Sequence, residues 1–372
     1  MKLTGLRAAG PVVRLSRYGA WAIPRYEAVS EVLRDHQRFS SAPNPGLEPD
    51  RPDLPKGGVL GSDPPDHTCM RGVLTEQLSS RALRTLRAEL DQRADRLVAE
   101  TIARGSFDAV TDLARRFPLD VVADLVGLPA DGRENLLALA DAGFDSFGPS
   151  NARTLAALPD VPKIFGYVAS SMSRENIAPG SWGDAVYHAV DRGVITEQEA
   201  VHLLLAYLVA GMDTTINAIS SAIWLLTQHP SAWAALRADP SLARAVLTET
   251  LRLESPVSFF CRGATRDATV SGIPIARGDR VIVLFGSANR DERKYPDPDR
   301  FDIERNAADH LAFGSGIHSC AGQALARIEG NAILAALARH AQTIQLAGQP
   351  VRHLNNTVRG LEHLPVTAQP AR

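Results

Sequence analysis

Residues 200–236 make up a long apolar stretch in which Asp213 is the only charged side chain. A segment of this length either spans a lipid bilayer or forms a helix buried inside a large protein. Polar side chains such as Asn217 and Gln228 interrupt the stretch, and an acid at mid-span would be costly in lipid. We therefore predict a long central helix, buried in a large domain, and no membrane segment. A capping box at residues 196–199 predicts where this helix begins.

The composition is that of one large domain covering residues 1–372. A net charge of −2 gives no reason to expect binding to nucleic acid or to an acidic membrane surface. The three cysteines, Cys69, Cys261 and Cys320, are far apart and odd in number, which argues against a disulfide framework. The chain starts without an apolar signal region. We expect a cytoplasmic protein.

Hydrophobic periodicity along the chain predicts a mainly α fold with minor β. Helical patterns follow the proline at position 24, fill most of residues 63–193, and recur before Glu254 and over residues 323–340. Short strands are expected within residues 12–23, 256–284 and 351–366. Irregular segments are expected at residues 40–65 and 290–306, which are rich in Pro and Asp.

A glycine-rich loop precedes the helix at residues 323–340 and contains Cys320. Glycines let the backbone approach another group closely and adopt positive φ. A cysteine at a helix start lies near unpaired N–H groups, which favours the thiolate. The loop therefore predicts an anionic sulfur presented to a partner, whereas a lone cysteine without other clues is usually buried and inert.

The segment from Phe313 to Gly322 resembles the heme-thiolate loop of the cytochrome P450 superfamily. It matches the pattern Phe-Gly-x-Gly-x-His/Arg-x-Cys-x-Gly at every fixed position. The resemblance covers nearly the whole chain, although the leading segment is shorter than is usual. It implies the triangular cytochrome P450 fold, a heme b cofactor with O2 as co-substrate, and Cys320 as the axial iron ligand.

The central helix carries Gly211, Asp213, Thr214 and Thr215, which are unfavourable choices for a buried helix. They predict a helix that is locally opened and lines a cavity. The alternative is a packing glycine beside a hydrogen-bonded acid. The segment resembles the acid–alcohol pair of the family, which implies that Thr214 hydrogen-bonds dioxygen and that Asp213 relays protons.

Further residues are assigned to the heme by the same resemblance. The propionates are expected to contact His67, Arg71, Arg262 and His318, because Arg and His suit carboxylates. Phe313 and Gly322 belong to the loop against the heme. Taken alone, His67 and Arg71 would more often be a solvated helix face.

Glu249 and Arg252 lie three residues apart on one predicted helix face. An exposed pair of this kind would be common and weak. The spacing resembles the Glu-x-x-Arg motif of the family, whose third member is an arginine of the following irregular segment. Arg300 is the candidate here, and the resemblance implies a structural network.

Several stretches resemble a branch of bacterial cytochromes P450 that oxidises small aromatic acids and methoxyphenols, including residues 132–137, 144–151, 285–291 and 355–362. The resemblance implies hydroxylation or O-demethylation. The expected substrate pocket comprises Phe144, Phe147, Val209, Ala210, Val257 and Phe260, with the two phenylalanines gripping a flat ring, although plain core packing would also explain them.

Acid-binding members of that branch use a serine on the central helix, where this chain has Val209, and an Arg and a Ser in the loop that here reads 53–60. The sequence therefore predicts that the carboxylate clamp is lost, with replacement by Lys56 as the alternative. We expect a neutral methoxyphenol rather than a benzoate.

Electrons are expected from a ferredoxin and an NAD(P)H-dependent ferredoxin reductase. Oxidation of a benzoate-type acid, tailoring of a natural product and peroxide-driven peroxygenase chemistry stay open as alternatives. A heme sensor or electron carrier would have no use for the Asp213–Thr214 pair. A hydrolase with Cys320 as nucleophile and His318 as base lacks a third orienting group.

Overall fold

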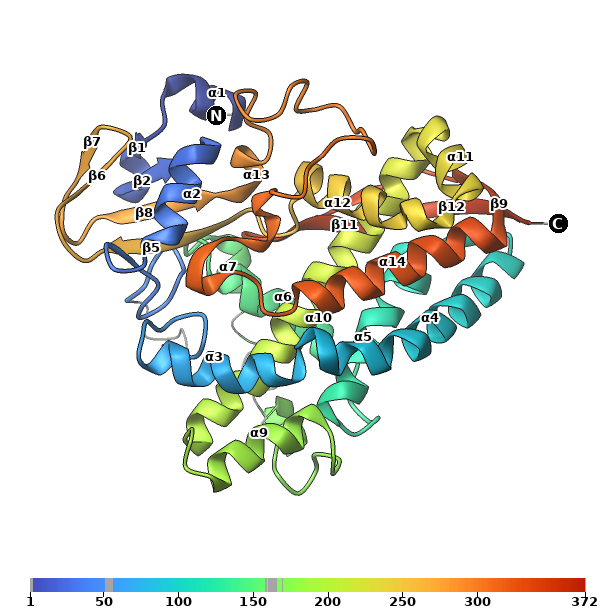
Figure 1. Cartoon of the computed structure of the whole chain (residues 1–372), viewed down its shortest axis with the longest axis horizontal. Helices are drawn as coiled ribbons and strands as arrows, with labels where there is room; N and C mark the ends of the chain where they lie inside the picture. Colours follow the sequence, from blue (N-terminus) through green and yellow to red (C-terminus); the bar gives the residue numbers. More distant parts are fainter. Residues whose placement is uncertain (1–2, 51–55, 158, 160–165, 169, 372) are drawn as a thin grey trace.

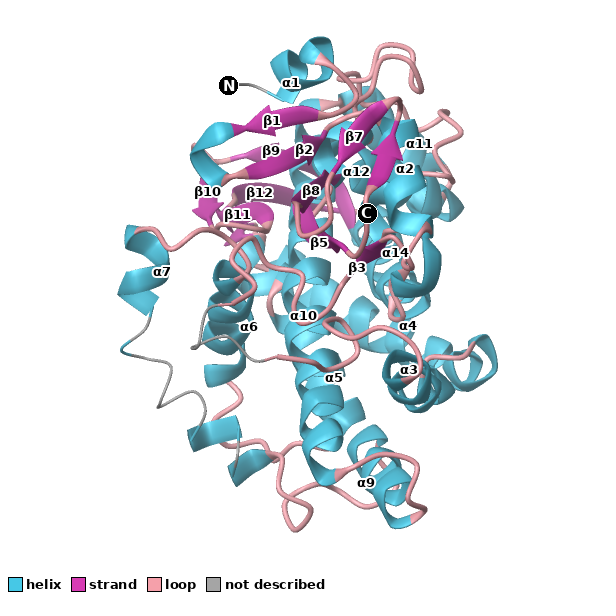
Figure 2. Cartoon of the chain, turned by 90° about the vertical axis from the view of Figure 1, so that its left-hand side faces the viewer, coloured by secondary structure: helices cyan, strands magenta, loops and turns pink. Residues whose placement is uncertain are grey.

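The computed structural model describes residues 3–50, 56–157, 159, 166–168 and 170–371. Figure 1 shows a helical region crossed by the long helix α10, Glu197–Gln228, with most strands gathered along one side of the molecule. Figure 2 shows α10 running down the centre beside α5, Arg116–Val126, and α6, Asn135–Ser146. The central helix therefore organises the packing of the elements around it.

The helix α10 begins at the predicted capping box. The Glu199 backbone N–H donates to Thr196 Oγ1 at 3.2 Å, and the Thr196 N–H donates to Glu199 Oε2 at 2.7 Å. Of the described residues, this helix alone is long and apolar enough to cross a membrane, yet 61% of its most apolar window is buried inside the protein. It is a core helix, as predicted. The expected local opening is wrong, because residues 210–215 are continuous α-helix. A threonine hydroxyl that bonds the preceding turn adapts to the helix without breaking it.

Two further helices pack on α10 and complete the centre of the molecule: α12, Ala243–Glu254, and α14, Gln323–His340. The other helical elements are α1 Leu3–Ala9, α2 Tyr26–Arg34, α3 Asp66–Gln77, α4 Ser80–Ala103, α7 Ala152–Ala157, α9 Trp182–Asp191, α11 Pro230–Ala238 and α13 Phe285–Ala288, with the π-helical turn η2 Val110–Ala114 and the 3₁₀ turns η1 Ser16–Tyr18, η4 Pro240–Leu242, η5 Leu311–Phe313 and η6 Gly316–His318.

The largest sheet has the order β1-β2-β8-β5-β3. It is antiparallel except where β2 and β8 run parallel, with Ala20 beside Arg280. Smaller sheets have the orders β4-β12-β9, β10-β11 and β6-β7. The strands are β1 Val13–Leu15, β2 Ala20–Ile23, β3 Phe39–Ser40, β4 Ser106–Asp108, β5 Phe259–Ala264, β6 Ala268–Val270, β7 Ile273–Ile275, β8 Arg280–Leu284, β9 Ala341–Leu346, β10 Val351–Leu354, β11 Arg359–His363 and β12 Pro365–Pro370. All three predicted strand regions contain strands.

The acid–base pair on α12 is fully buried. Arg252 Nη2 and Nε donate to the two carboxylate oxygens of Glu249 at 2.7 and 2.8 Å. The third member is Arg305, whose Nε lies 3.1 Å from Glu249 Oε1. The prediction of Arg300 is wrong for its side chain, which is 65% exposed and pairs with Asp302. Arg300 contributes only its carbonyl oxygen, which accepts from Arg252 Nη2 at 3.2 Å.

Candidate functional site

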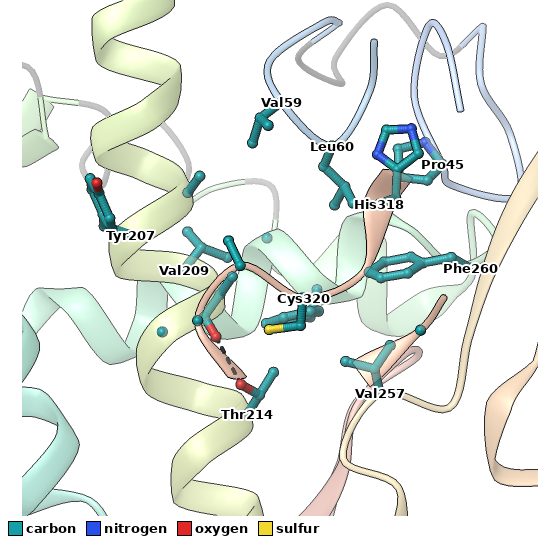
Figure 3. Close-up of a pocket in the computed structure, with 18 of the residues that line it drawn as sticks. Pro45, Val59, Leu60, Tyr207, Val209, Thr214, Val257, Phe260, His318 and Cys320 are labelled. Carbon is teal, nitrogen blue, oxygen red and sulfur yellow. Dashed lines mark hydrogen bonds between the residues drawn. The ribbon is translucent and has the colours of Figure 1, made fainter. Parts of the chain in front are cut away.

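A mainly apolar cavity of about 460 Å³ lies between α10, α6 and the loop that contains Cys320. Figure 3 shows Val209 and Thr214 on the α10 side and Val59 and Leu60 above the loop. Val59 and Leu60 belong to the loop in which the acid-binding members bind their substrate, and both line the cavity. Residues 53–55 of that loop lie outside the described residues. Lys56 is exposed and is not among the described residues that line the cavity. The alternative that Lys56 replaces the carboxylate clamp is therefore not supported, in agreement with the expected loss of the clamp.

The cysteine loop is held rigidly over the cavity. Gly316 has φ +75°, and a Cβ at this position would lie 2.3 Å from the carbonyl oxygen of Leu33, so only glycine fits. The Cys320 N–H donates to the Phe313 carbonyl at 2.8 Å, and Arg71 Nη2 donates to the Ser319 carbonyl at 2.6 Å. Cys320, Phe313 and Gly322 all line the cavity, and Figure 3 shows the cysteine sulfur turned into it.

The protonation of Cys320 differs from the sequence-based expectation. Burial raises the pKa of the thiol above its usual range, and it outweighs the backbone N–H of Gly322 and the charge of Arg71, which lower it. The backbone at the start of α14 does lower the pKa of the thiol, as predicted, but burial has the larger effect. A cation bound against the sulfur would favour the thiolate, because coordination deprotonates a thiol.

Arginine and histidine side chains gather at one end of the cavity. Arg71, Arg262 and His318 line it, and the His67 ring packs on the His318 ring with centroids 4.4 Å apart. Arg262 is 3% exposed, and its Nη1 donates to the Cys261 carbonyl at 2.8 Å. Burial lowers the pKa of Arg262 to about 10, so it stays charged at neutral pH. The Nε2 atoms of His67 and His318 are buried without a hydrogen-bond partner.

These groups indicate an anionic ligand, because a buried charge or polar atom without partners is costly. His318 Nε2 lies 3.9 Å from Asp63 Oδ1, beyond hydrogen-bonding distance. Burial lowers the pKa of His67 to about 4, so its ring is neutral at pH 7. The predicted residues therefore come together at one end of the cavity from α3, β5 and the cysteine loop, with His67 behind His318.

The side chains of the predicted acid–alcohol pair, Asp213 and Thr214, lie in different surroundings. Thr214 lines the cavity, and its Oγ1 donates to the Ala210 carbonyl at 2.8 Å. Asp213 is not among the described lining residues, and its Oδ2 is buried without a partner. Burial raises the pKa of Asp213 to about 6. The two residues thus offer a hydroxyl inside the cavity and a proton-holding acid behind it.

The six predicted pocket residues all line the cavity. Aromatic rings meet edge to face along one wall, with centroids 6.3 Å apart for Phe144 and Phe147 and 5.5 Å apart for Phe147 and Phe260. Phe285, which sequence reasoning missed, continues this run 6.1 Å from Phe260. The wall offers a flat aromatic group several edges and faces.

Glu329 on α14 is a second residue that the sequence reasoning missed. It lines the cavity, is fully buried, and neither carboxylate oxygen has a hydrogen-bond partner. Burial raises its pKa well above the usual range, which favours the protonated form. An acid among the apolar residues of the predicted helix at 323–340 could have indicated a buried carboxyl group.

Comparison with known proteins decides the family. Residues 183–358 match the family profile described as Cytochrome P450. The chain is 44% identical over 370 residues to cytochrome P450 CYP199A2 of Rhodopseudomonas palustris, covering 98% of this chain and 90% of that protein. The chain belongs to the cytochrome P450 family. The family resemblance of the cysteine loop is thereby confirmed.

Solved structures of cytochromes P450 share the fold. The structure of CYP109Q5 from Chondromyces apiculatus matches with a TM-score of 0.85 and 30% identity, covering 99% of this chain and 95% of that one. The cytochrome P450 CREJ, solved in complex with (4-ethylphenyl) dihydrogen phosphate, matches with a TM-score of 0.90 and 26% identity, covering 99% and 96%. The predicted P450 fold, mainly α with minor β around a long central helix, is confirmed.

Membership in the cytochrome P450 family establishes the reaction type and the cofactor. The chain is a monooxygenase that uses heme b with O2 as co-substrate and takes electrons from redox partners. The site fits this cofactor, because the cysteine sulfur and the cluster of Arg and His side chains lie on the same large apolar cavity, and His318 Nε2 is buried there without a hydrogen-bond partner.

Proposed function

We propose that this cytochrome P450 hydroxylates or O-demethylates a small neutral aromatic compound of the methoxyphenol class. The observation that carries the proposal is the composition of the cavity wall. Edge-to-face phenylalanines form much of the apolar lining, and among the described lining residues the only Arg or Lys side chains, Arg71 and Arg262, belong to the cluster assigned to the propionates. A flat, uncharged ring suits such a wall.

The chain's own residues have separate roles in holding the cofactor. The Cys320 sulfur would ligate the heme iron, and Phe313 and Gly322 of the same loop would contact the heme. Arg71, Arg262 and His318 would bind the propionates, and His67 would support His318. When bound, the heme activates dioxygen so that one oxygen atom enters the substrate.

Thr214 and Asp213 would manage protons near the reacting centre. The Thr214 hydroxyl already bonds a carbonyl one turn away, so it can exchange this bond for one to a group in the cavity. Asp213 can hold or release a proton near neutral pH because burial raises its pKa to about 6.

A substrate carboxylate would find poor surroundings in this cavity. The lining cations Arg71 and Arg262 lie at the end assigned to the propionates, and the lining acids Asp145 and Glu329 would repel or fail to pair with a carboxylate. Burial lowers the pKa of His202, the remaining lining imidazole, so it is neutral at pH 7. A neutral ring avoids the desolvation cost of an unpaired charge.

The similar proteins are consistent with an aromatic substrate. CREJ was solved with an aryl phosphate, so this fold accommodates a substituted benzene ring. We propose a ferredoxin and an NAD(P)H-dependent ferredoxin reductase as the electron donors, in the cytoplasm. The small net charge of −2 gives no support for nucleic acid as a partner.

Ligand titration into the ferric holoenzyme tests the proposed substrate class. Guaiacol and 4-methoxybenzyl alcohol should convert the heme from low to high spin at lower concentrations than 4-methoxybenzoate, which matches the alcohol in shape but carries a charge. Tighter binding of the benzoate than of both neutral ligands would contradict the proposal. Formaldehyde release during turnover would then identify O-demethylation.

A further inference from the structure

Asp213 lies on the face of α10 that is covered by two other elements. Val209, Asp213 and Asn217 are spaced four residues apart, so they follow one another along the same side of the helix. A Cβ at Gly143 of α6 would lie 3.1 Å from Val209 Cγ1, one turn before Asp213. The helix α6 therefore packs against α10 just ahead of the acid.

The hairpin β10–β11 covers the same face one turn after Asp213. A Cβ at Gly360 would lie 1.6 Å from Asn217 Oδ1, so the strand β11 passes directly over that side chain. His353 of β10 is the cross-strand neighbour of Gly360. The histidine is thus brought close to the stretch of α10 that contains Asp213.

A short hydrogen bond joins the two covering elements. His353 Nε2 lies 2.7 Å from Asp141 Oδ1 of α6, and Asn355 Nδ2 donates to the same oxygen at 2.8 Å. The side chains of His353 and Asp141 are 21% and 40% exposed, so this pair reaches solvent. The His353–Asp141 hydrogen bond thus links α6, which contacts α10 one turn before Asp213, to the hairpin, which contacts α10 one turn after it. An acid–imidazole pair that reaches solvent therefore lies close to Asp213.

We propose that the Asp141–His353 pair supplies protons from solvent to Asp213, with His353 as the positioning residue that acts through the acid. The inference rests on the proposed relay role of Asp213. Because Nε2 is engaged with Asp141, the proton that leaves the imidazolium is the one on Nδ1. Because Asp213 Oδ2 has no direct hydrogen-bond partner, a water molecule would carry this proton to the Asp213 carboxylate. The neutral imidazole then regains a proton from solvent, so the pair returns to its starting state.

The charges around His353 suit this role. Asp141 and Asp145 face it from α6, Asp213 from α10, and Arg115 from the start of α5. The hydrogen bond to Asp141 is the main reason that the pKa of His353 is raised above its usual value, and Asp213 raises it further while Arg115 opposes. The imidazolium form of His353 is therefore favoured more than in a free histidine, which suits a proton donor.

The test compares three variants of the holoenzyme with any ligand that converts the heme to high spin, so it does not depend on the methoxyphenol assignment. His353→Gln removes the proton donor and Asp141→Asn removes the charge that raises its pKa. His363→Ala is the matched control, because His363 lies on the same hairpin and pairs with Asp108 at 2.9 Å on the outside. The readouts are heme content, ligand-induced spin shift, product formed per NAD(P)H, solvent isotope effect and the pH profile of turnover.

His353→Gln should keep heme content and the spin shift while lowering coupled turnover by about tenfold and raising the solvent isotope effect. Asp141→Asn should move the alkaline limb of the pH profile to lower pH, because the imidazolium loses its stabilising charge. His363→Ala should match the wild type. An unchanged isotope effect in His353→Gln together with an unmoved limb in Asp141→Asn would overturn the proposal, and would show a purely structural ion pair. A protein that lacks the spin shift with every aromatic ligand would instead count against the proposed substrate class.

Discussion

Arg305 Nε lies 3.1 Å from Glu249 Oε1 and completes a buried network that ties the irregular segment before the cysteine loop to α12. Its Nη1 also donates to the Pro296 carbonyl at 2.7 Å. The side chain is 11% exposed, against 65% for Arg300. Arg305 therefore joins the irregular segment to the buried core, whereas the side chain of Arg300, five residues earlier, faces solvent.

Arg305→Ala should destabilise the holoenzyme by about 1–3 kcal/mol, because Glu249 loses a charged partner in a buried site. Arg300→Ala is the control, and it should change stability by less than about 0.5 kcal/mol because the carbonyl that accepts from Arg252 is retained. Thermal unfolding with heme absorbance as the probe measures both. Equal losses in the two variants would contradict the assignment of Arg305.

Gly316→Ala should reduce heme content, because the new Cβ would meet the Leu33 carbonyl and the positive φ would cost about 1–3 kcal/mol. Gly72→Ala is the control, since Gly72 lies on α3 with nothing within 4 Å of a new Cβ. That variant should be as stable as the wild type or slightly more stable. The ratio of heme absorbance to protein absorbance after purification decides the matter, and normal loading of Gly316→Ala would be the contrary result.

Asp213→Asn should stabilise the protein while it lowers coupled turnover. Burial raises the pKa of Asp213 from 3.8 to about 6, so the folded state binds the proton more tightly and loses stability as pH rises between these values. Above pH 6 the variant should be more stable by on the order of 2–3 kcal/mol, and below pH 4 the gain should vanish. Denaturant unfolding at a series of pH values checks this. A loss of stability at pH 7 would mean that the acid is paired in the native state.

Phe147→Ala should weaken binding of an aromatic ligand by about tenfold, since it removes the ring that bridges Phe144 and Phe260. Phe147→Leu keeps apolar volume without the aromatic edge and should fall between that variant and the wild type. The ligand concentration for half-maximal spin shift is the measurement. Unchanged values for both variants would assign Phe147 to core packing alone.

Local signals in the sequence were sufficient for much of the fold. The capping box at Thr196 and the apolar periodicity fixed the start of α10 and both ends of α14, because these depend on neighbouring residues. The cysteine loop could also be predicted from sequence, since its glycines and Cys320 lie within ten residues.

Relationships between distant segments were harder to predict. The choice of Arg305 over Arg300 depends on how an irregular segment turns back, and no local periodicity encodes that turn. The approach of His353 to Asp141 joins residues 212 positions apart and depends on a hairpin crossing α10. The effect of burial on Cys320 was also missed: burial raises the pKa of the thiol against the influence of the helix start, and burial can be judged only in the folded protein.

The spectrum of the reduced, CO-bound holoenzyme tests the assignment of Cys320 as the heme ligand most directly. The wild-type protein should show the red-shifted Soret band that gives the family its name, and Cys320→His should retain heme but lose that band. The band would persist in Cys320→His, or would be absent from a heme-loaded wild-type protein, only if the sulfur of Cys320 is not the axial ligand.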